Sequence, residues 1–227
     1  MTRVAADLAG RSLWDRIVYR TVRNLLYVFL KVWCRLRVEG REHVPVDGPY
    51  ILAPTHRSII DTPAASAVVH TRLRFMGADK WWANRILGRT LSALGGFPVT
   101  RGSADREALK RCITVLEGGE PLVMFPEGER KSGPVVQPLF EGAAYIAMKS
   151  GVPVVPVGIG GSERVMPKGA KFIHPRRIHI VIGPALRLSD DAGATPKEQR
   201  IASRRLTNDL HAELQRLFDL AESRATS

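Results

Sequence analysis

The stretch YILAPTHRSIID, residues 50–61, joins an apolar run to a polar turn and to the start of a helical segment. Its first four residues, 50–53, read as a short buried strand, and residues 58–70 have the spacing of a helix. His56 lies in the turn, five positions before Asp61. A strand that leads directly into a helix is the repeating unit of an α/β domain, so this stretch predicts the fold class.

The same alternation continues along the rest of the chain. Thr195, Pro196 and Glu198 form the capping box of a last helix that runs to about residue 222. The pattern predicts an α/β fold with a single domain, residues 38–227, and a mixed, mostly buried sheet flanked by helices. The other expected elements are strands at 73–76, 98–100, 122–125, 154–159 and 178–182, and helices at 84–94, 103–117 and 141–150.

A β-branched run at residues 151–158 is interrupted by Pro153 and Pro156. Proline cannot donate a hydrogen bond to a sheet, so the run is not expected to be a central strand along its whole length. We interpret it as an edge strand, or as a strand whose first part lines a groove.

An amphipathic segment, residues 12–37, precedes the domain. Its longest apolar run ends at Lys31, well short of the roughly 20 apolar residues of a transmembrane helix. Three arginines on another face suit a helix in the interface of an anionic membrane, whereas the alternative is a helix packed on its own domain. We predict an amphipathic membrane-interface helix in residues 1–37, with an apolar face of Trp14, Val18, Val22, Leu25, Phe29, Trp33 and Leu36.

The composition narrows the class of partner. Lysine and arginine total 34 against 22 aspartate and glutamate, a net charge of +12 over 227 residues. This excess favours a polyanionic partner, which nucleic acid, an anionic lipid surface or a phosphorylated substrate would each supply. With 44% hydrophobic residues the chain can build a core, which excludes a disordered protein.

Several common sites are absent from the sequence. There is no GxGxxG after a strand, no GxxxxGK[ST] loop, no HExxH and no GxSxG, and the other histidines lack the spacing of a metal site. Cys34 and Cys112 form no CxxC pattern, which indicates a reducing compartment. The N-terminus lacks the continuous apolar region of a signal peptide.

His56 and Asp61 are the first candidates for chemistry. A carboxylate on one imidazole nitrogen fixes the tautomer and stabilises the imidazolium, while the other nitrogen takes a proton from a substrate hydroxyl. The first turn of a helix that begins near Ser58 would bring Asp61 back toward His56. The alternative is structural, because Ser58 and Asp61 also have the spacing of a capping box.

A second turn carries candidates for anion binding. The strand at 122–125 leads into Glu127, Gly128 and Arg130. Ligands gather at the carboxyl ends of strands in α/β sheets, glycine permits close approach of the backbone, and the arginine fork suits a phosphate. The alternative is a solvated charged turn.

A third turn ends the strand at 98–100 and carries Arg101 between glycines. Arg101 is a second candidate for anion binding, and Lys80 is placed in the same patch. The alternative is a surface arginine in a tight loop.

Together these motifs resemble the glycerolipid acyltransferase family, the HxxxxD acyltransferases that include 1-acylglycerol-3-phosphate acyltransferases. The resemblance covers about residues 36–185. Its marks are HxxxxD at 56–61, a strand ending in arginine at 95–101, FPEGxR at 125–130, FEGAAYIA at 140–147 and VPV at 155–157.

The chain departs from the family pattern at three positions. Thr55 stands where the family often has asparagine, and Pro98 stands where an aliphatic or aromatic residue is frequent. Glu129 replaces the threonine of EGTR and adds a negative charge beside the expected phosphate site. This last departure bears on the acceptor more than on the reaction.

The resemblance implies a reaction and a role for each candidate. His56, held by Asp61, would deprotonate a lysophospholipid hydroxyl, most directly that of 1-acyl-sn-glycerol 3-phosphate, and the oxygen would attack an acyl thioester. Backbone N–H groups near the start of the helix after His56 would stabilise the oxyanion. The acceptor phosphate would be bound or enclosed by Arg101, Glu127, Gly128, Arg130 and Lys80.

The resemblance also implies an acyl donor and a location. The donor would be acyl-CoA or acyl carrier protein, with no other cofactor, no metal and no nucleic acid partner. The site would lie at the cytoplasmic face of the cell membrane, on a peripheral or monotopic protein. Three alternatives stay open: another lysophospholipid or glycolipid acceptor, a soluble thioester hydrolase, and a non-catalytic basic protein that binds anionic membrane.

Overall fold

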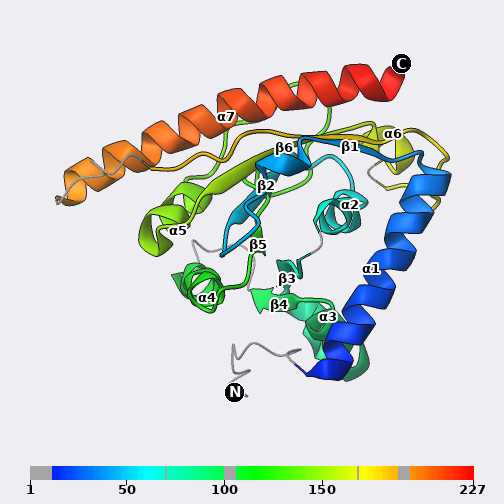
Figure 1. Cartoon of the computed structure of the whole chain (residues 1–227), viewed down its shortest axis with the longest axis horizontal. Helices are drawn as coiled ribbons and strands as arrows, with labels where there is room; N and C mark the ends of the chain where they lie inside the picture. The colour runs from blue at the N-terminus through cyan, green and yellow to red at the C-terminus, as the bar shows by residue number, and fades with distance from the viewer. Residues whose placement is uncertain (1–11, 70, 100–105, 168, 189–194) are drawn as a thin grey trace.

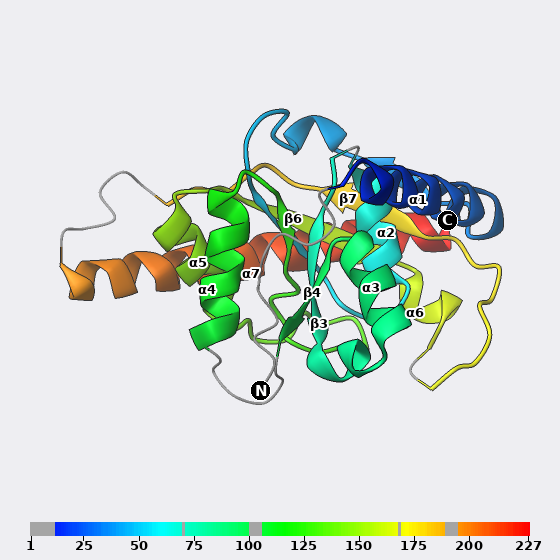
Figure 2. The same cartoon turned by 90° about the horizontal axis from the view of Figure 1, so that it is seen from below.

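The computed structural model describes residues 12–69, 71–99, 106–167, 169–188 and 195–227. A seven-stranded sheet lies between two layers of helices (Figures 1 and 2). The strand order is β1-β7-β6-β2-β5-β3-β4, and every pair is parallel except the antiparallel pair β6–β7. The strands are β1 Arg37–Glu39, β2 Ile51–Pro54, β3 Arg74–Ala78, β4 Gly96–Val99, β5 Leu122–Val123, β6 Val154–Gly160 and β7 His179–Ile182.

Helices cover both faces of this sheet. Figure 2 shows α4 and α5 on one side and α1, α2 and α3 on the other, whereas α7 runs behind the sheet across its width. Their bounds are α1 Leu13–Trp33, α2 Asp61–Val68, α3 Arg85–Ala93, α4 Arg106–Glu117, α5 Gly142–Ser150, α6 Ser162–Val165 and α7 Pro196–Thr226, with short 3₁₀ turns η1 Arg41–His43 and η2 Asp79–Ala83.

Each face of the sheet has its own apolar core. Because side chains of a strand alternate, Leu52 of β2 packs into the core beneath α1 and α2, whereas Ile51 and Ala53 pack into the core beneath α4, α5 and α7. Both faces are therefore buried, as expected for a largely parallel sheet. The α/β prediction is confirmed, and all six predicted strands are present.

The interpretation of the run 151–158 as an edge strand is wrong, whereas the groove along its first part stays a prediction. β6 lies in the middle of the sheet, between β2 and β7. Pro156 is tolerated because it falls between an isolated bridge at Val154 and the β7 ladder, which begins at Val157. Its carbonyl still accepts from the N–H of Gly183, and its missing N–H lies where no ladder bond is formed.

Two glycines let α7 lie directly on β6 (Figure 1). A Cβ atom on Gly158 would stand 2.4 Å from the carbonyl of Leu217, and one on Gly160 would stand 2.2 Å from that of Ala221. These distances are shorter than any real contact, so only glycine allows helix and strand backbones to approach this closely. The contact places the side chains of α7 next to the ends of the central strands.

The substitution Gly158→Ala should lower the free energy of unfolding by about 1–3 kcal/mol, because the added methyl group forces α7 away from β6. Urea unfolding followed by circular dichroism measures the change. Gly142→Ala is a matched control, since a Cβ there meets only ordinary contacts at 3.8 and 3.9 Å. Equal stability of the two variants would contradict the close packing of α7.

The N-terminal helix α1 has features of both alternatives, a helix packed on its own domain and a helix with an apolar face open to a membrane. Tyr19 and Leu30 are buried, and the Tyr19 hydroxyl accepts from the N–H of Leu73, so one face packs on the domain. Another face leaves large apolar side chains exposed, among them Trp14 (69% exposed) and Val32 (73%). Among the described residues, no helix has the length and apolar character needed to cross a bilayer. The membrane role of residues 1–37 stays a prediction.

Candidate active site

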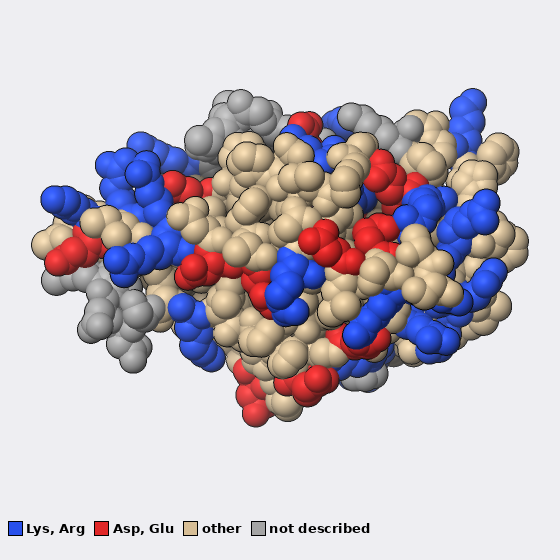
Figure 3. Space-filling view, turned by 90° about the horizontal axis from the view of Figure 1, so that it is seen from above, with Lys and Arg blue, Asp and Glu red and all other residues tan. Residues whose placement is uncertain are grey.

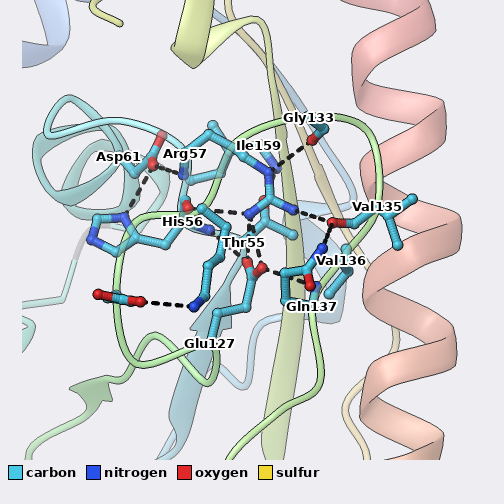
Figure 4. A network of polar contacts seen from close by, with 12 residues as sticks. Thr55, His56, Arg57, Asp61, Glu127, Gly133, Val135, Val136, Gln137 and Ile159 are labelled. Atoms are coloured by element: carbon cyan, nitrogen blue, oxygen red, sulfur yellow. Dashed lines mark hydrogen bonds and ion pairs between the residues drawn. The ribbon is translucent and has the colours of Figure 1, made fainter. Parts of the chain in front are cut away.

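The candidate residues meet at the carboxyl ends of the central strands β2 and β5. The chain leaves β2 through Thr55 and His56, and it leaves the neighbouring β5 through Phe125, Pro126 and Glu127. Adjacent parallel strands deliver their following loops to the same edge of a sheet, which is where α/β folds bind ligands. Figure 4 shows the two loops in contact.

His56 and Asp61 form a hydrogen-bonded pair. The Nδ1 atom of His56 lies 3.1 Å from the Oδ2 atom of Asp61, whose side chain is fully buried. A carboxylate only accepts, so Nδ1 carries the proton and Nε2 is left as an acceptor. The ring of Phe125 stacks on the imidazole with centroids 3.9 Å apart and limits its rotation.

One oxygen of Asp61 also holds the turn. Oδ2 accepts from the backbone N–H groups of Arg57 at 2.7 Å and Ser58 at 2.6 Å. The other oxygen, Oδ1, is buried and has no hydrogen-bond partner within the described ranges of the chain. The expectation that these N–H groups near the helix start would stabilise an oxyanion is therefore wrong for both of them.

The capping-box alternative holds only in part. The carboxylate of Asp61 does reach back to the N–H of Ser58, but α2 begins at Asp61 itself. The Ser58 hydroxyl donates to the carbonyl of Met166 at 2.8 Å and does not cap the N–H of Asp61. Asp61 therefore serves the histidine and the turn together.

The loops after β2 and β5 are bound to each other through the backbone of His56. Its N–H donates to Oε1 of Glu127 at 3.1 Å, and its carbonyl accepts from the N–H of Lys131 at 2.9 Å. The Thr55 hydroxyl accepts from the N–H of Ile159 at 3.0 Å. Threonine at this position, a departure from the family pattern, ties the turn that carries His56 to β6.

Sequence reasoning missed Arg57. Its side chain is 1% exposed, and Nη1 lies 2.8 Å from each carboxylate oxygen of Glu127, which is itself fully buried. A buried charge of this kind requires a full set of partners. Nothing local in the sequence signals the pair, because the two residues are 70 positions apart.

Glu127 and Gly128, both predicted at the phosphate site, have different surroundings. The Glu127 carboxylate lies behind the histidine and is occupied by Arg57, His56 and the N–H of Gln137. Gly128 lines the cavity in front, with a φ of 74°. A Cβ on Gly128 would stand 2.6 Å from the ring of Phe140, so glycine is required there.

The structure describes two of the three cationic side chains that the sequence predicts at the phosphate site. Arg130 follows Gly128 by two residues, and its guanidinium makes no ion pair or hydrogen bond with any residue that the structure describes. Lys80 is exposed, with its ammonium 5.6 Å from the ring centroid of Trp81. Arg101 lies outside the described residues.

The negative charge of Glu129 is neutralised locally. Its Oε1 atom lies 2.8 Å from the Nζ atom of Lys131, and its side chain is 73% exposed. This departure from the family pattern therefore places an ion pair, and not an isolated carboxylate, beside Arg130.

A cavity of about 340 Å³ opens beside the imidazole. A second, more apolar cavity of about 180 Å³ lies between α1, α2 and α3 and shares Thr62 and Phe75 with the first. The imidazole of His56 next to apolar walls suits a ligand that has a polar and an apolar part. The larger cavity is lined by His56, Phe75, Met76, Ala78, Val99 and Phe140, among others.

Neither cysteine is placed to act as a nucleophile. Burial raises the pKa of the Cys34 thiol to about 11 and that of the Cys112 thiol to about 12, so both stay protonated at neutral pH. In the part of the chain that the structure describes, no three His, Cys, Asp or Glu side chains come together as a metal site would require. The imidazole of His56 lines the cavity at this edge of the sheet and is the candidate for acid–base chemistry.

Comparisons with known proteins agree with this geometry. A family model described as Acyltransferase matches residues 35–160. The chain is 27% identical over 203 residues to a 1-acyl-sn-glycerol-3-phosphate acyltransferase of Bacillus subtilis, covering 89% of this chain and 99% of that protein. It is 32% identical over 185 residues to a protein of the same name from Streptococcus pneumoniae, covering 78% of this chain and 65% of that one.

A solved structure also has the same fold. The crystal structure of the 1-acyl-sn-glycerophosphate (LPA) acyltransferase PlsC from Thermotoga maritima superposes with a TM-score of 0.70 and 23% identity. The likeness covers 92% of this chain and 85% of that one, so it extends beyond the region that the family model matches.

Proposed function

This chain belongs to the acyltransferase family, and we propose that it transfers a fatty acyl group from an acyl thioester to the free hydroxyl of a lysophospholipid. The acceptor is 1-acyl-sn-glycerol 3-phosphate and the product is phosphatidic acid, as the names of the relatives support. The observation that carries the proposal is the 3.1 Å contact between His56 and Asp61 at the wall of the larger cavity.

The geometry supports general base catalysis by His56. Asp61 keeps the proton on Nδ1, so Nε2 takes the proton of the acceptor hydroxyl as its oxygen attacks the thioester carbonyl. The tetrahedral intermediate collapses by breaking the C–S bond, and the departing thiolate takes the proton back from His56. No acyl-enzyme forms, so neither buried cysteine takes part.

Arg130 is proposed to bind the acceptor phosphate, because it follows Gly128, which lines the larger cavity, by two residues. Arg101 and Lys80 are proposed to add to the same anion site, as the sequence predicts. A planar guanidinium binds a phosphate through two parallel hydrogen bonds, each stronger than a bond between neutral groups.

Replacing Arg130 by alanine should raise the KM for the lysophospholipid about 10- to 100-fold, because one charged hydrogen-bonding group is lost. The KM for the acyl donor should stay within about 2-fold. Steady-state kinetics with each substrate varied in turn measures both constants. Arg216→Ala, which removes an exposed arginine paired with Glu213 on α7, is the control. Unchanged acceptor KM in Arg130→Ala would remove this residue from the phosphate site.

The acyl donor is proposed to be acyl-CoA or acyl carrier protein, both of which are anionic. Figure 3 shows lysine and arginine side chains gathered toward both ends of the face that α7 covers. Exposed cations on the first half of α7 include Lys197, Arg200, Arg204 and Arg205. A basic surface raises the local concentration of either donor.

A donor-by-acceptor matrix tests the proposed substrates. The purified protein is incubated with acyl-CoA or acyl carrier protein and with lysophosphatidic acid, lysophosphatidylinositol or other lysolipids, and the products are identified by mass spectrometry. We expect phosphatidic acid to be the main product. If lysophosphatidic acid is the poorest acceptor, the acceptor is a different lysolipid.

The exposed face of α1 is proposed to bind the cytoplasmic face of the cell membrane, where acceptor and product reside. Large apolar side chains such as Trp14, Val32 and Trp33 stand beside arginines on this helix. Aromatic and cationic side chains on one helix suit the headgroup region of an anionic bilayer.

The double substitution Trp14→Asp/Val32→Asp should weaken binding to vesicles that contain phosphatidylglycerol by at least about 10-fold, because two exposed apolar groups no longer enter the interface. Vesicle sedimentation measures the bound fraction. Ile201→Asp changes an exposed apolar residue on α7 and serves as the control. Equal binding by both variants would show that α1 does not contact the membrane.

A further inference from the structure

The C-terminal helix α7 holds the backbone of the loop at residues 133–137. Oε1 of Gln215 accepts from the N–H of Val136 at 2.8 Å, and Nε2 of Gln215 donates to the carbonyl of Pro134 at 3.1 Å. Nε2 of His211 donates to the carbonyl of Val136 at 2.9 Å. These bonds fix both the donor and the acceptor groups of an irregular segment to one rigid helix.

The same loop receives hydrogen bonds from Arg57. Nε of Arg57 donates to the carbonyl of Gly133 at 3.2 Å, and Nη2 donates to the carbonyl of Val135 at 3.1 Å, as Figure 4 shows. The guanidinium also lies 4.7 Å from the ring centroid of Phe218 on α7. Helix α7 therefore positions Arg57 by direct stacking and through the loop.

The remaining edge of Arg57 reaches the backbone of His56. Nη1 donates to both oxygens of Glu127 and to the carbonyl of His56 at 3.1 Å. Glu127 in turn accepts from the N–H of His56. The peptide groups on both sides of the histidine are thus held by a buried ion pair, whose own position depends on the 133–137 loop.

From these contacts we propose that α7 positions His56 for catalysis through the 133–137 loop and the Arg57–Glu127 pair. His211, Gln215, Phe218 and Arg57 are then positioning residues that touch no substrate. This inference rests on the proposed function, because the position of His56 affects the rate only if His56 is the general base. Helix α7 lies outside residues 35–160, the region that the family model matches.

The physical reason is the sensitivity of proton transfer to geometry. A displacement of about 1 Å at a catalytic group costs about 10²-fold in rate. The carbonyls of Gly133 and Val135 belong to a segment without regular secondary structure, so they depend on side-chain donors: Arg57 donates to both, and Gln137 of the same segment donates to that of Val135. Loosening α7 contacts should therefore lower kcat and leave the binding of both substrates unchanged.

The first test compares His211→Leu with His211→Gln on the full chain. Leucine removes the donor to Val136, whereas glutamine carries an amide N–H at a similar reach. We expect kcat to fall about 10-fold in His211→Leu, with both KM values within about 2-fold, and to recover in His211→Gln. A purely structural role would lower the melting temperature of His211→Leu without this selective loss and recovery of kcat.

The second test uses Gln215→Ala against Arg216→Ala, an exposed neighbour on the same helix. Gln215→Ala should lower kcat about 10-fold, again with both KM values preserved. Arg216→Ala should retain the wild-type kcat. Arg57→Lys, which keeps the charge beside Glu127 but not the planar fork, should lose about 10²-fold in kcat.

Three results would overturn the positioning role. These are wild-type kcat in folded His211→Leu and Gln215→Ala, a change confined to KM, or a His211→Gln variant no better than His211→Leu. If Arg57→Lys does not fold, the His211 and Gln215 variants decide the question.

A parallel assay of wild type and His56→Ala separates this inference from the proposed function. If neither protein transfers acyl groups, the proposed function fails, and if both do so equally, the catalytic role of His56 fails. If only His56→Ala is inactive and the α7 variants keep full kcat, the proposed function stands and only the positioning inference fails.

Discussion

Replacing His56 by alanine should lower kcat for acyl transfer about 10²- to 10⁴-fold, because the group that accepts the hydroxyl proton is removed. The side chain is only 15% exposed and lies against Phe125, so the variant leaves a small space without burying a polar group. The protein should therefore stay folded. Initial rates of phosphatidic acid formation, measured at saturating concentrations of both substrates, give kcat.

The control is His174→Ala, which changes an exposed histidine away from the cavity. Circular dichroism and thermal unfolding of both variants verify folding. Undiminished activity in folded His56→Ala would show that His56 is not the general base. No acyl transfer by the wild type would support a non-catalytic basic membrane protein. Release of thiol at the full rate without lysolipid would instead indicate a hydrolase of acyl thioesters.

Replacing Asp61 by asparagine should lower kcat by a similar factor, about 10²- to 10⁴-fold, because a neutral amide does not stabilise the imidazolium of His56. If the asparagine oxygen takes the position of Oδ2, it can still accept from the N–H groups of Arg57 and Ser58. The same oxygen can also accept from Nδ1 of His56, so the imidazole keeps its orientation and only the negative charge beside it is lost. Without that charge the imidazolium that forms as His56 takes the hydroxyl proton is less stable.

The measurement is again kcat, combined with thermal unfolding to separate chemistry from the structural role of Asp61. Asp47→Asn, at an exposed position, is the matched control. A folded Asp61→Asn variant with wild-type kcat would show that the carboxylate serves only the turn. The two largest effects thus probe the two members of one hydrogen-bonded pair.

Most of the fold could be predicted because its signals are local. Each predicted strand is an apolar run, and the last helix carries its own capping box at Thr195 and Glu198. β1 was missed because three residues, Arg37–Glu39, with one apolar side chain give no periodic signal. The error at Pro156 arose because its tolerance depends on where β7 begins to pair, a fact that belongs to the neighbouring strand.

The candidate site likewise has residues that the sequence could predict and residues that it could not. His56 and Asp61 could be paired from the sequence because they are five positions apart and a single tight turn brings them together. Arg57 stands between them in the motif, but its partners lie on the loops after β5 and at 133–137, and on α7. Those contacts depend on strand order and on how α7 crosses the sheet, which no local pattern specifies.

The close packing of α7 on Gly158 and Gly160 has a consequence for folding during synthesis in the cell. Because α7 follows every strand in the chain, a ribosome completes the sheet while the part of one face that α7 covers is still exposed. The nascent chain exposes that face until α7 has left the exit tunnel, so chaperones that bind apolar segments should engage it during this interval. Premature termination before α7 would release a polypeptide prone to aggregation and degradation.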